Sequence, residues 1–213
     1  MMSNPAKKYL IISVVFLIGI LGGIAIGLAT SSVTASVAAT YAKSHPLTTS
    51  NITAILEYEK GLESYISKQE LPYLFISSAL TSIVGVIAFL LFLSIKLTTN
   101  FPGSTLGVVG SLIYLIVQVI GVINPQYSQE GVTGFLSLAS GNLTVLGVLS
   151  ILFIVIGLLA SILLGIGFFK SGSAYNNTII KVGGILFIIP GIDVIAVFLL
   201  VFGYLGAMRN RDS

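Results

Sequence analysis

The sequence VGGILFIIPGIDVIAVFLLVFGYLGAM, residues 182–208, is a long apolar run that contains a single formal charge, Asp193. Pro190 and Gly191 come just before the aspartate, and such a pair readily interrupts a helix. A carboxyl group in hydrocarbon costs roughly 2.5–3.5 kcal/mol on insertion scales, so it normally faces a partner, water or a pathway. This run therefore bears on both the fold and the function.

The whole chain shares this apolar composition. Its 213 residues are 55% hydrophobic and 8% charged, with a mean hydropathy of +1.06. A soluble domain carries roughly 25% charged residues, so this composition cannot form a water-facing surface. We therefore expect one integral membrane domain over residues 1–213, with the lipid bilayer as its main partner. The net charge of +3 comes from scattered residues without a basic patch, which argues against nucleic acid as a partner.

Uncharged runs define the expected spans, because about 20 apolar residues cross a bilayer core of about 30 Å. The sequence predicts an all-α, polytopic transmembrane helix bundle with about five spans. These spans are 9–28 (extended toward 42), 71–95, 104–124, 143–169 and 182–208, the last kinked at Pro190-Gly191. An external polar and amphipathic loop is expected at 42–70.

The basic residues leave two interpretations of the last run. With five spans and a cytoplasmic N-terminus, five of the ten basic residues fall on each side, although basic residues normally favour the cytoplasm. If the run turned back at Pro190-Gly191, Arg209 and Arg211 would move inside and the count would be seven against three. However, residues 182–189 are too few to cross, and a re-entrant segment must be shielded by protein. We therefore expect five spans in the plasma membrane, with the N-terminus cytoplasmic.

Small residues recur at four-residue spacing in two predicted spans. They are Gly19, Gly23 and Gly27 in the first span, and Gly157, Ser161 and Gly165 in the fourth. Such ridges let helices approach closely in lipid. Packing within the bundle is the expected use, and contact with other membrane subunits or with a second copy through the first ridge is the alternative. The spacing continues to Ala39, so we expect the first helix to extend past the membrane as a packed rod.

Three roles are open for Asp193. Pro190 lacks a backbone donor, so Asp193 can cap or hydrogen-bond the freed backbone of the next half-helix. Alternatively, it lies on a proton or cation pathway. The third possibility is a re-entrant segment that brings the carboxyl group near a water-filled mouth. We favour the structural role.

An enzyme is not expected. The chain has no cysteine and one histidine, His45, which precedes Pro46 in a polar loop. A pair of intramembrane aspartates is excluded because Asp193 is the only acid in a predicted span. One histidine cannot form an HExxH zinc site, and the sequence contains no phosphate-binding glycine loop. No cofactor or metal site is expected. Asn51 begins an Asn-Ile-Thr sequon in the external loop and is the best candidate for glycosylation.

The C-terminal third also shows a family-like pattern. The stretch GFFKSGSAYNNTIIKVGGILFIIPGIDVIAVFLLVFGYLG, residues 167–206, resembles an uncharacterised archaeal multi-pass membrane protein family, the domain of unknown function nine-seven-three. In that family a Gly-x-x-Tyr-Asn-like turn ends a helix, and a segment like I-K-V-G-G-I-L-x-I-I-P opens the last span. Tyr175, Asn176 and residues 180–190 match these features, and residues 100–121 look like the family's middle span. The resemblance implies an archaeal envelope protein without catalytic residues.

These observations favour a non-enzymatic membrane protein. The leading hypothesis is a structural or accessory subunit of a cell-envelope complex. The alternative is a small transporter or channel component in which Asp193 couples transport to a proton or cation.

Overall fold

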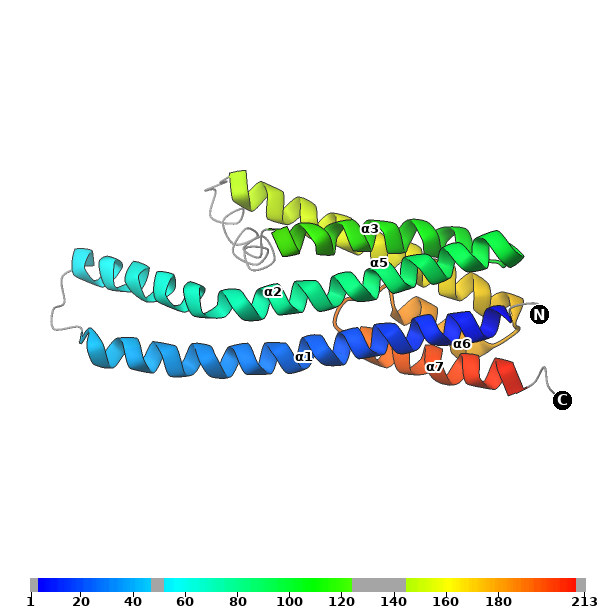
Figure 1. Cartoon of the computed structure of the whole chain (residues 1–213), viewed down its shortest axis with the longest axis horizontal. Helices are drawn as coiled ribbons and strands as arrows, with labels where there is room; N and C mark the ends of the chain where they lie inside the picture. The colour runs from blue at the N-terminus through cyan, green and yellow to red at the C-terminus, as the bar shows by residue number, and fades with distance from the viewer. Residues whose placement is uncertain (1–3, 47–51, 124–144, 210–213) are drawn as a thin grey trace.

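The computed structural model describes residues 4–46, 52–123 and 145–209, and within them every regular element is an α-helix (Figure 1). The fold is an all-α helical bundle, as predicted. Its helices are α1 (Pro5–Ser44), α2 (Ile52–Thr99), α3 (Ser104–Ile123), α5 (Val145–Ala174), α6 (Thr178–Leu186) and α7 (Asp193–Arg209). Neighbours in the chain pack side by side, and α7 returns to pack against α1, so the six helices form a closed ring.

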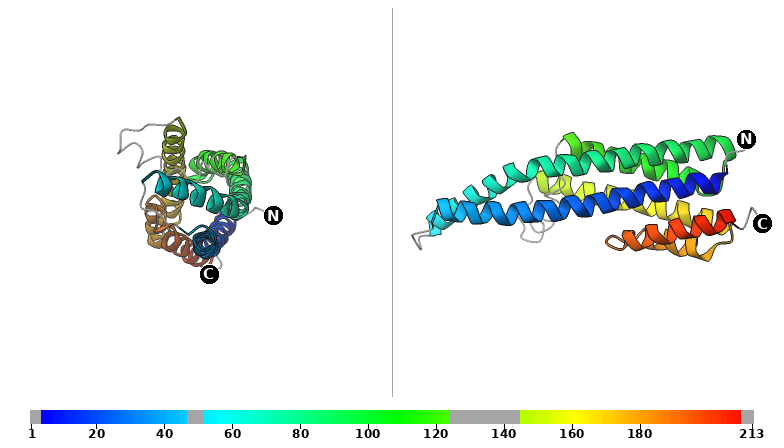
Figure 2. Two further views of the ribbon diagram at one scale, coloured as in Figure 1. Left: turned by 90° about the vertical axis from the view of Figure 1, so that its left-hand side faces the viewer. Right: turned by 60° about the horizontal axis from the view of Figure 1, so that its bottom comes forward.

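Four of the described helices, α1, α2, α3 and α5, are long and apolar enough to cross a membrane. The prediction of five spans is therefore wrong. Residues 182–208 do not form one kinked helix but belong to α6 and α7, which pack against each other as a hairpin. Figure 2 shows this hairpin ending well short of the far ends of α1 and α2.

The chain reverses at Pro190-Gly191 for a local reason. The amides of Ile188 and Ile189 still donate to Ile185 and Leu186, respectively, in a tightened last turn. Pro190 then offers no backbone donor, and Gly191 has φ +89°, a conformation that side chains with a Cβ rarely adopt. A helix cannot continue through this pair, so α7 starts anew at Asp193.

The first two helices extend far beyond the rest of the bundle (Figure 1). α1 has 40 residues and α2 has 48, which correspond to about 60 and 70 Å, twice the thickness of a bilayer core. The expected extension of the first helix is thus confirmed. The polar residues from 52 onward, expected within a loop, form the first part of α2, which continues through Pro72. We call residues 29–44 and 52–70 the rod.

An aromatic cluster joins the two helices of the rod. The ring of Tyr41 stacks on His45 at 4.3 Å and contacts the rings of Tyr58 and Tyr65 at 5.3 and 5.5 Å. Gly61 makes room for the Tyr41 hydroxyl, which a Cβ at that position would overlap. Closer to the membrane, the hydroxyl of Thr34 donates to the carboxylate of Glu70. His45 itself is exposed to solvent, as expected, although its ring stacks on that of Tyr41.

The six helices lie together along only half of the bundle's length. We call this the packed half: residues 5–19, 84–114 and 160–209. Every buried hydrophobic side chain described for the chain falls within it. Beyond the hairpin tip lies the open half, residues 20–44, 52–83, 115–123 and 145–159, where Ser78 is the only described side chain that is buried.

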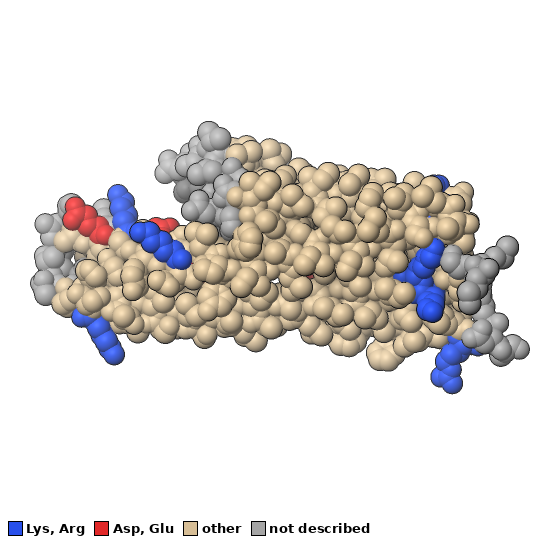
Figure 3. Space-filling model, viewed as in Figure 1, with Lys and Arg blue, Asp and Glu red and all other residues tan. Residues whose placement is uncertain are grey.

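The charged residues gather at the two ends of the molecule, and Asp193 is the only described charged residue in the band between them (Figure 3). The end where α1 begins and α7 finishes carries Lys7, Lys8, Lys96, Lys170, Lys181 and Arg209, and we call it the basic end. Among the described residues no acid lies there, because Glu57, Glu59, Glu63 and Glu70 are all in the rod. This band fits a bilayer core.

Candidate functional site

The hairpin is fixed by aromatic packing at the basic end. Tyr204 of α7 is completely buried and stacks on Tyr9 of α1, with ring centroids 5.2 Å apart. Its hydroxyl is hydrogen-bonded to that of Ser171 on α5. The hydroxyl of Tyr9 donates to the carbonyl of Pro102 across 3.2 Å. These contacts hold α7 against α1 and α5 and fill the centre of the packed half.

Aromatic rings continue this packing toward the hairpin tip. Phe187, at the end of α6, contacts both Phe16 and Phe168 with centroids 5.4 Å apart. Phe168 in turn contacts Phe92 at 5.8 Å. The interior of the packed half is therefore apolar, with no described charged side chain inside it. Asp193 lies where this filling ends.

The depth of Asp193 follows from helix geometry. It precedes Tyr204 by 11 residues in a continuous helix, which is about 16 Å of rise. Tyr204 is level with Tyr9, the first residue of the apolar stretch after Lys8. If Tyr9 marks the edge of a bilayer core about 30 Å thick, this rise places Asp193 near the middle of the core.

The carboxyl group of Asp193 is partly exposed, and within the described part of the chain it takes part in no hydrogen bond. The expected capping of the next helix is not seen, because no described amide of α7 donates to it. Tyr114 of α3 lies close enough to interact with it electrostatically. Tyr114 also contacts Phe16, with ring centroids 5.9 Å apart. The acid is therefore within electrostatic range of one phenol, Tyr114, at the edge of the aromatic packing.

Polar side chains occur on α2 and α3 beyond Tyr114. Gln118 follows Tyr114 by one helical turn on the same face of α3. The hydroxyl of Thr81 on α2 donates to the Gln118 side-chain oxygen across 2.6 Å. Ser78, one turn before Thr81, is the buried side chain of the open half. Tyr114, Gln118 and Thr81 were missed in the sequence, although Gln118 is the only amide in its apolar run.

The predicted small-residue ridges divide between the two halves. A Cβ on Gly19 would meet Val84 of α2 at 2.7 Å, whereas Cβ atoms on Gly23, Gly27 and Gly157 would meet nothing within 4 Å. The first ridge thus contacts the bundle at one end only.

The second ridge behaves in the same way. A Cβ on Gly165 would meet the carbonyl oxygen of Gly184 at 2.6 Å, because α5 and α6 approach closely there. Ser161 donates to its own helix, at the carbonyl of Gly157. The closest helix contacts also involve glycines that the spacing did not single out, above all Gly103, whose Cβ would overlap Gly167.

Metal ligands do not cluster in the described residues, where no three His, Cys, Asp or Glu side chains come together. Asn51, the candidate for glycosylation, lies outside the described residues. The site therefore consists of one carboxyl group at the tip of a half-membrane hairpin, with a phenol beside it and amide and hydroxyl groups farther along α3 and α2.

Comparison with known proteins adds no relative to this description: no family model, no curated protein and no solved structure matches the chain. The fold itself defines the class, an all-α helical bundle with four helices able to span a membrane. The resemblance to the archaeal family stays a prediction.

Proposed function

We propose that this protein is a membrane transport component in which Asp193 binds a proton or small cation halfway across the bilayer. The observation that carries the proposal is a partly exposed carboxyl group at mid-membrane depth without a hydrogen bond to any described residue. Such a group is costly in lipid, and where it occurs it commonly marks an ion or proton pathway. Broken helices whose half-helix ends meet near the midplane are also a recurring feature of transporters.

The polar groups of α2 and α3 support access from the rod end. The basic-end side of Asp193 is filled by aromatic rings such as Phe187 and Phe168. Toward the rod end, Tyr114, Gln118 and Thr81 offer successive groups that can exchange hydrogen bonds with water or an ion. A route to Asp193 through the open half is therefore less costly than one through the packed half.

The orientation of the protein follows from its charges. Six of the nine described basic residues lie at the basic end and three, Lys43, Lys60 and Lys68, lie in the rod. Basic residues favour the cytoplasmic side, which supports a plasma-membrane protein with its N-terminus inside and its rod outside. The hairpin supports this orientation, because it brings Arg209 to the same end as Lys181.

The test is flux through reconstituted vesicles. Purified protein is placed in liposomes that contain a pH-sensitive dye or, in a parallel preparation, a sodium-sensitive dye, and a potassium diffusion potential drives cations inward. We expect flux with the unaltered protein and with Glu63→Gln, which removes an exposed carboxylate of the rod, and no flux with Asp193→Asn. Equal flux from Asp193→Asn, or none above protein-free liposomes from the unaltered chain, contradicts the proposal.

The structural or accessory role is the second candidate, and the rod favours it. Its two helices extend past the bundle and expose Glu57, Glu59, Lys60, Glu63 and Lys68 to water, which suits contact with another protein. Deleting residues 36–64 and joining the helices by a short loop would then remove a co-purifying partner while the bundle still inserts. Asp193→Asn would leave that partner bound, which separates the two candidates.

A further inference from the structure

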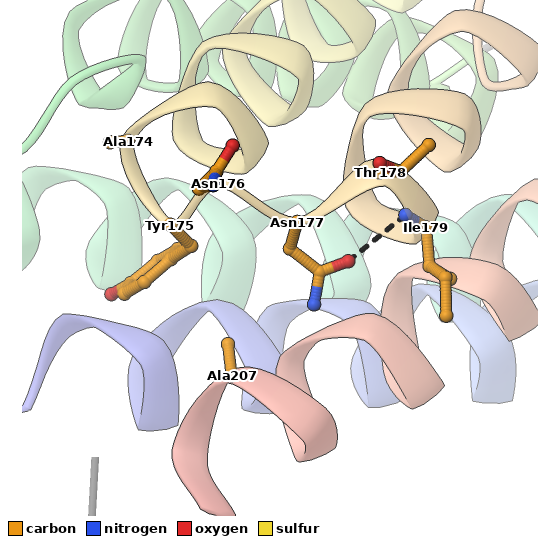
Figure 4. A pocket seen from close by; sticks show the side chains of 7 residues that line it. All are labelled: Ala174, Tyr175, Asn176, Asn177, Thr178, Ile179 and Ala207. Atoms are coloured by element: carbon orange, nitrogen blue, oxygen red, sulfur yellow. Dashed lines mark hydrogen bonds between the residues drawn. The ribbon is translucent and has the colours of Figure 1, made fainter. Parts of the chain in front are cut away.

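A hollow of about 430 Å³ lies at the basic end, where the chain turns from α5 into α6 (Figure 4). It is lined by Ala174, Tyr175, Asn176, Asn177, Thr178, Ile179 and Ala207. Asn176 and Thr178 are exposed, so an amide and a hydroxyl group are available to a ligand. The hollow lies outside the proposed Asp193 pathway, which begins at the opposite end of α7.

Asn177 shapes this hollow but is already engaged. Its side-chain oxygen accepts from the amides of Ile179 and Ile180 at 2.9 and 3.2 Å, and its side-chain nitrogen donates to the carbonyl of Gly203 at 3.0 Å. Figure 4 shows its side chain directed toward α7. Because Asn177 occupies these amides of α6, a ligand here must be held by other groups.

Two lysines lie about one helical turn from residues that line the hollow. Lys181 follows Thr178 by three residues on α6, and Lys170 precedes Ala174 by four on α5, so each shares a helix face with a lining residue. The two helices touch closely here, since a Cβ on Gly172 would lie 2.8 Å from the backbone nitrogen of Lys181. In α6 the side-chain direction, toward the helix N-terminus, carries Lys181 toward the hollow, whereas on α5 the same direction leads away from it, so Lys170 reaches the hollow through its long, flexible side chain.

These two positive charges lack a counter-charge in the described part of the molecule. Every described acid lies in the rod or, as Asp193, at the hairpin tip, about half a bilayer away. Two ammonium groups held by adjacent helices repel each other unless an anion neutralises them. A hollow about one helical turn from both lysines is therefore suited to an anionic group.

The surface on the membrane side of the hollow is apolar. Phe169 of α5 is 38% exposed, and Val182 and Ile185 of α6 are 41% and 49% exposed. They lie deeper in the membrane than the lysines or at the same level. A free anion would gain nothing from these side chains, whereas an acyl chain would cover them.

We infer that this hollow binds the head group of an anionic phospholipid, with Lys170 and Lys181 at its phosphate and the acyl chains along α5 and α6. The hydroxyl of Thr178 and the amide of Asn176 complete the contacts to the head group. The lipid comes from the leaflet at the basic end, which positive-inside orientation makes the anionic cytoplasmic leaflet. The site belongs to the whole protein and is independent of transport through Asp193.

The test is lipid retention measured by native mass spectrometry of the full chain in detergent. Phosphatidylglycerol and phosphatidylcholine are added in separate titrations. We expect the unaltered chain to prefer phosphatidylglycerol and the Lys170→Gln/Lys181→Gln variant to bind it about 30-fold more weakly (about 2 kcal/mol). Lys60→Gln/Lys68→Gln, which removes two charges from the rod, should bind it as the unaltered chain does.

A second variant tests the inference independently, in case the double lysine variant does not fold. Asn176 has φ +50°, and aspartate tolerates this conformation about as well as asparagine, so Asn176→Asp should fold normally. Its charge at the rim should weaken phosphatidylglycerol binding several-fold. Unchanged binding by both variants, an equal loss from the rod variant, or equal retention of phosphatidylcholine overturns the inference. Displacement of the lipid by millimolar inorganic phosphate would also overturn it, since the hollow would then be a site for free phosphate.

Discussion

The packed half and the open half contain the same four long helices, yet they differ in almost every structural respect. In the packed half, glycines such as Gly103 and Gly184 bring backbones together, and aromatic rings fill the centre. In the open half, Gly23 and Gly157 face no neighbouring atom. Lipid provides no hydrophobic drive for helix association, so close packing needs enough helices to surround a centre. The difference shows that the short hairpin, not the long helices, creates the core.

The largest effect is expected from the centre of the packed half. Tyr204→Ala should lower the free energy of unfolding by about 4 kcal/mol, because it empties a completely buried site beside Tyr9. Tyr65→Ala in the rod, where the ring is 39% exposed, should cost about 1 kcal/mol or less. Thermal unfolding in detergent, followed by circular dichroism, measures both. Similar losses from the two variants would remove the distinction between the halves.

A matched pair of glycines tests the same distinction with one chemical change. Gly103→Ala should cost about 3 kcal/mol, since Gly103 has φ +88° and its Cβ would overlap Gly167. Gly157→Ala should be neutral or stabilising by about 0.5 kcal/mol, because it lies in a helix with free space around it. Unfolding midpoints of the two variants give the comparison, and a loss from Gly157→Ala would reveal a contact in the open half.

Asp193 lies at the boundary between the halves, and its replacement should stabilise the protein. Asp193→Leu removes an unpaired acid from mid-membrane depth and should raise the free energy of unfolding by about 1 kcal/mol. Asp193→Asn, which stays polar, should change it little. Unfolding in a denaturing detergent measures both variants. A clear loss of stability from either would instead show that the carboxyl group holds the hairpin in place.

The smallest effect concerns the polar pair of the open half. Thr81→Val removes the hydrogen bond to Gln118 and should cost about 0.6 kcal/mol, the average for such pairs in membrane proteins. Ser82→Ala is the control, because Ser82 donates to its own helix at the carbonyl of Ser78. A double-mutant cycle with Gln118→Leu isolates the pair. A coupling near zero would separate Thr81 and Gln118 from any continuous polar route.

Two prolines show how far the sequence predicts the fold. Pro72 and Pro190 each remove a backbone donor, but α2 runs through Pro72 whereas the chain reverses at Pro190. The difference is Gly191, whose positive φ supplies the turn that a lone proline does not. The distribution of basic residues already favoured the reversal, because a turn at Pro190-Gly191 places Arg209 and Arg211 on the cytoplasmic side. The shielding that a re-entrant hairpin requires could not be foreseen, because it comes from α1 and α5.

The glycine ridges show why the packing was harder to predict. The regular spacing of Gly19, Gly23 and Gly27 suggests a continuous contact, but spacing says nothing about which helix lies opposite. Of the three, only Gly19 meets a neighbour, Val84 of α2, whereas Gly22, which lies outside the ridge, meets Leu80 of the same helix. In the same way, Asp193 stands out in the sequence, whereas Tyr114 becomes its neighbour only through the fold.

The contact between α1 and α7 has a consequence for how the protein is made. α1 leaves the ribosome well before α7 is made, yet each covers the other in the finished ring. At 5–20 residues per second, the intervening chain of about 150 residues takes roughly 10–30 s to synthesise. During this time Tyr9 and Phe16 face lipid without their final partners. Insertion of the four long helices and closure of the ring are therefore separate events, and a chain that stops before Asp193 reaches the membrane but cannot complete its core.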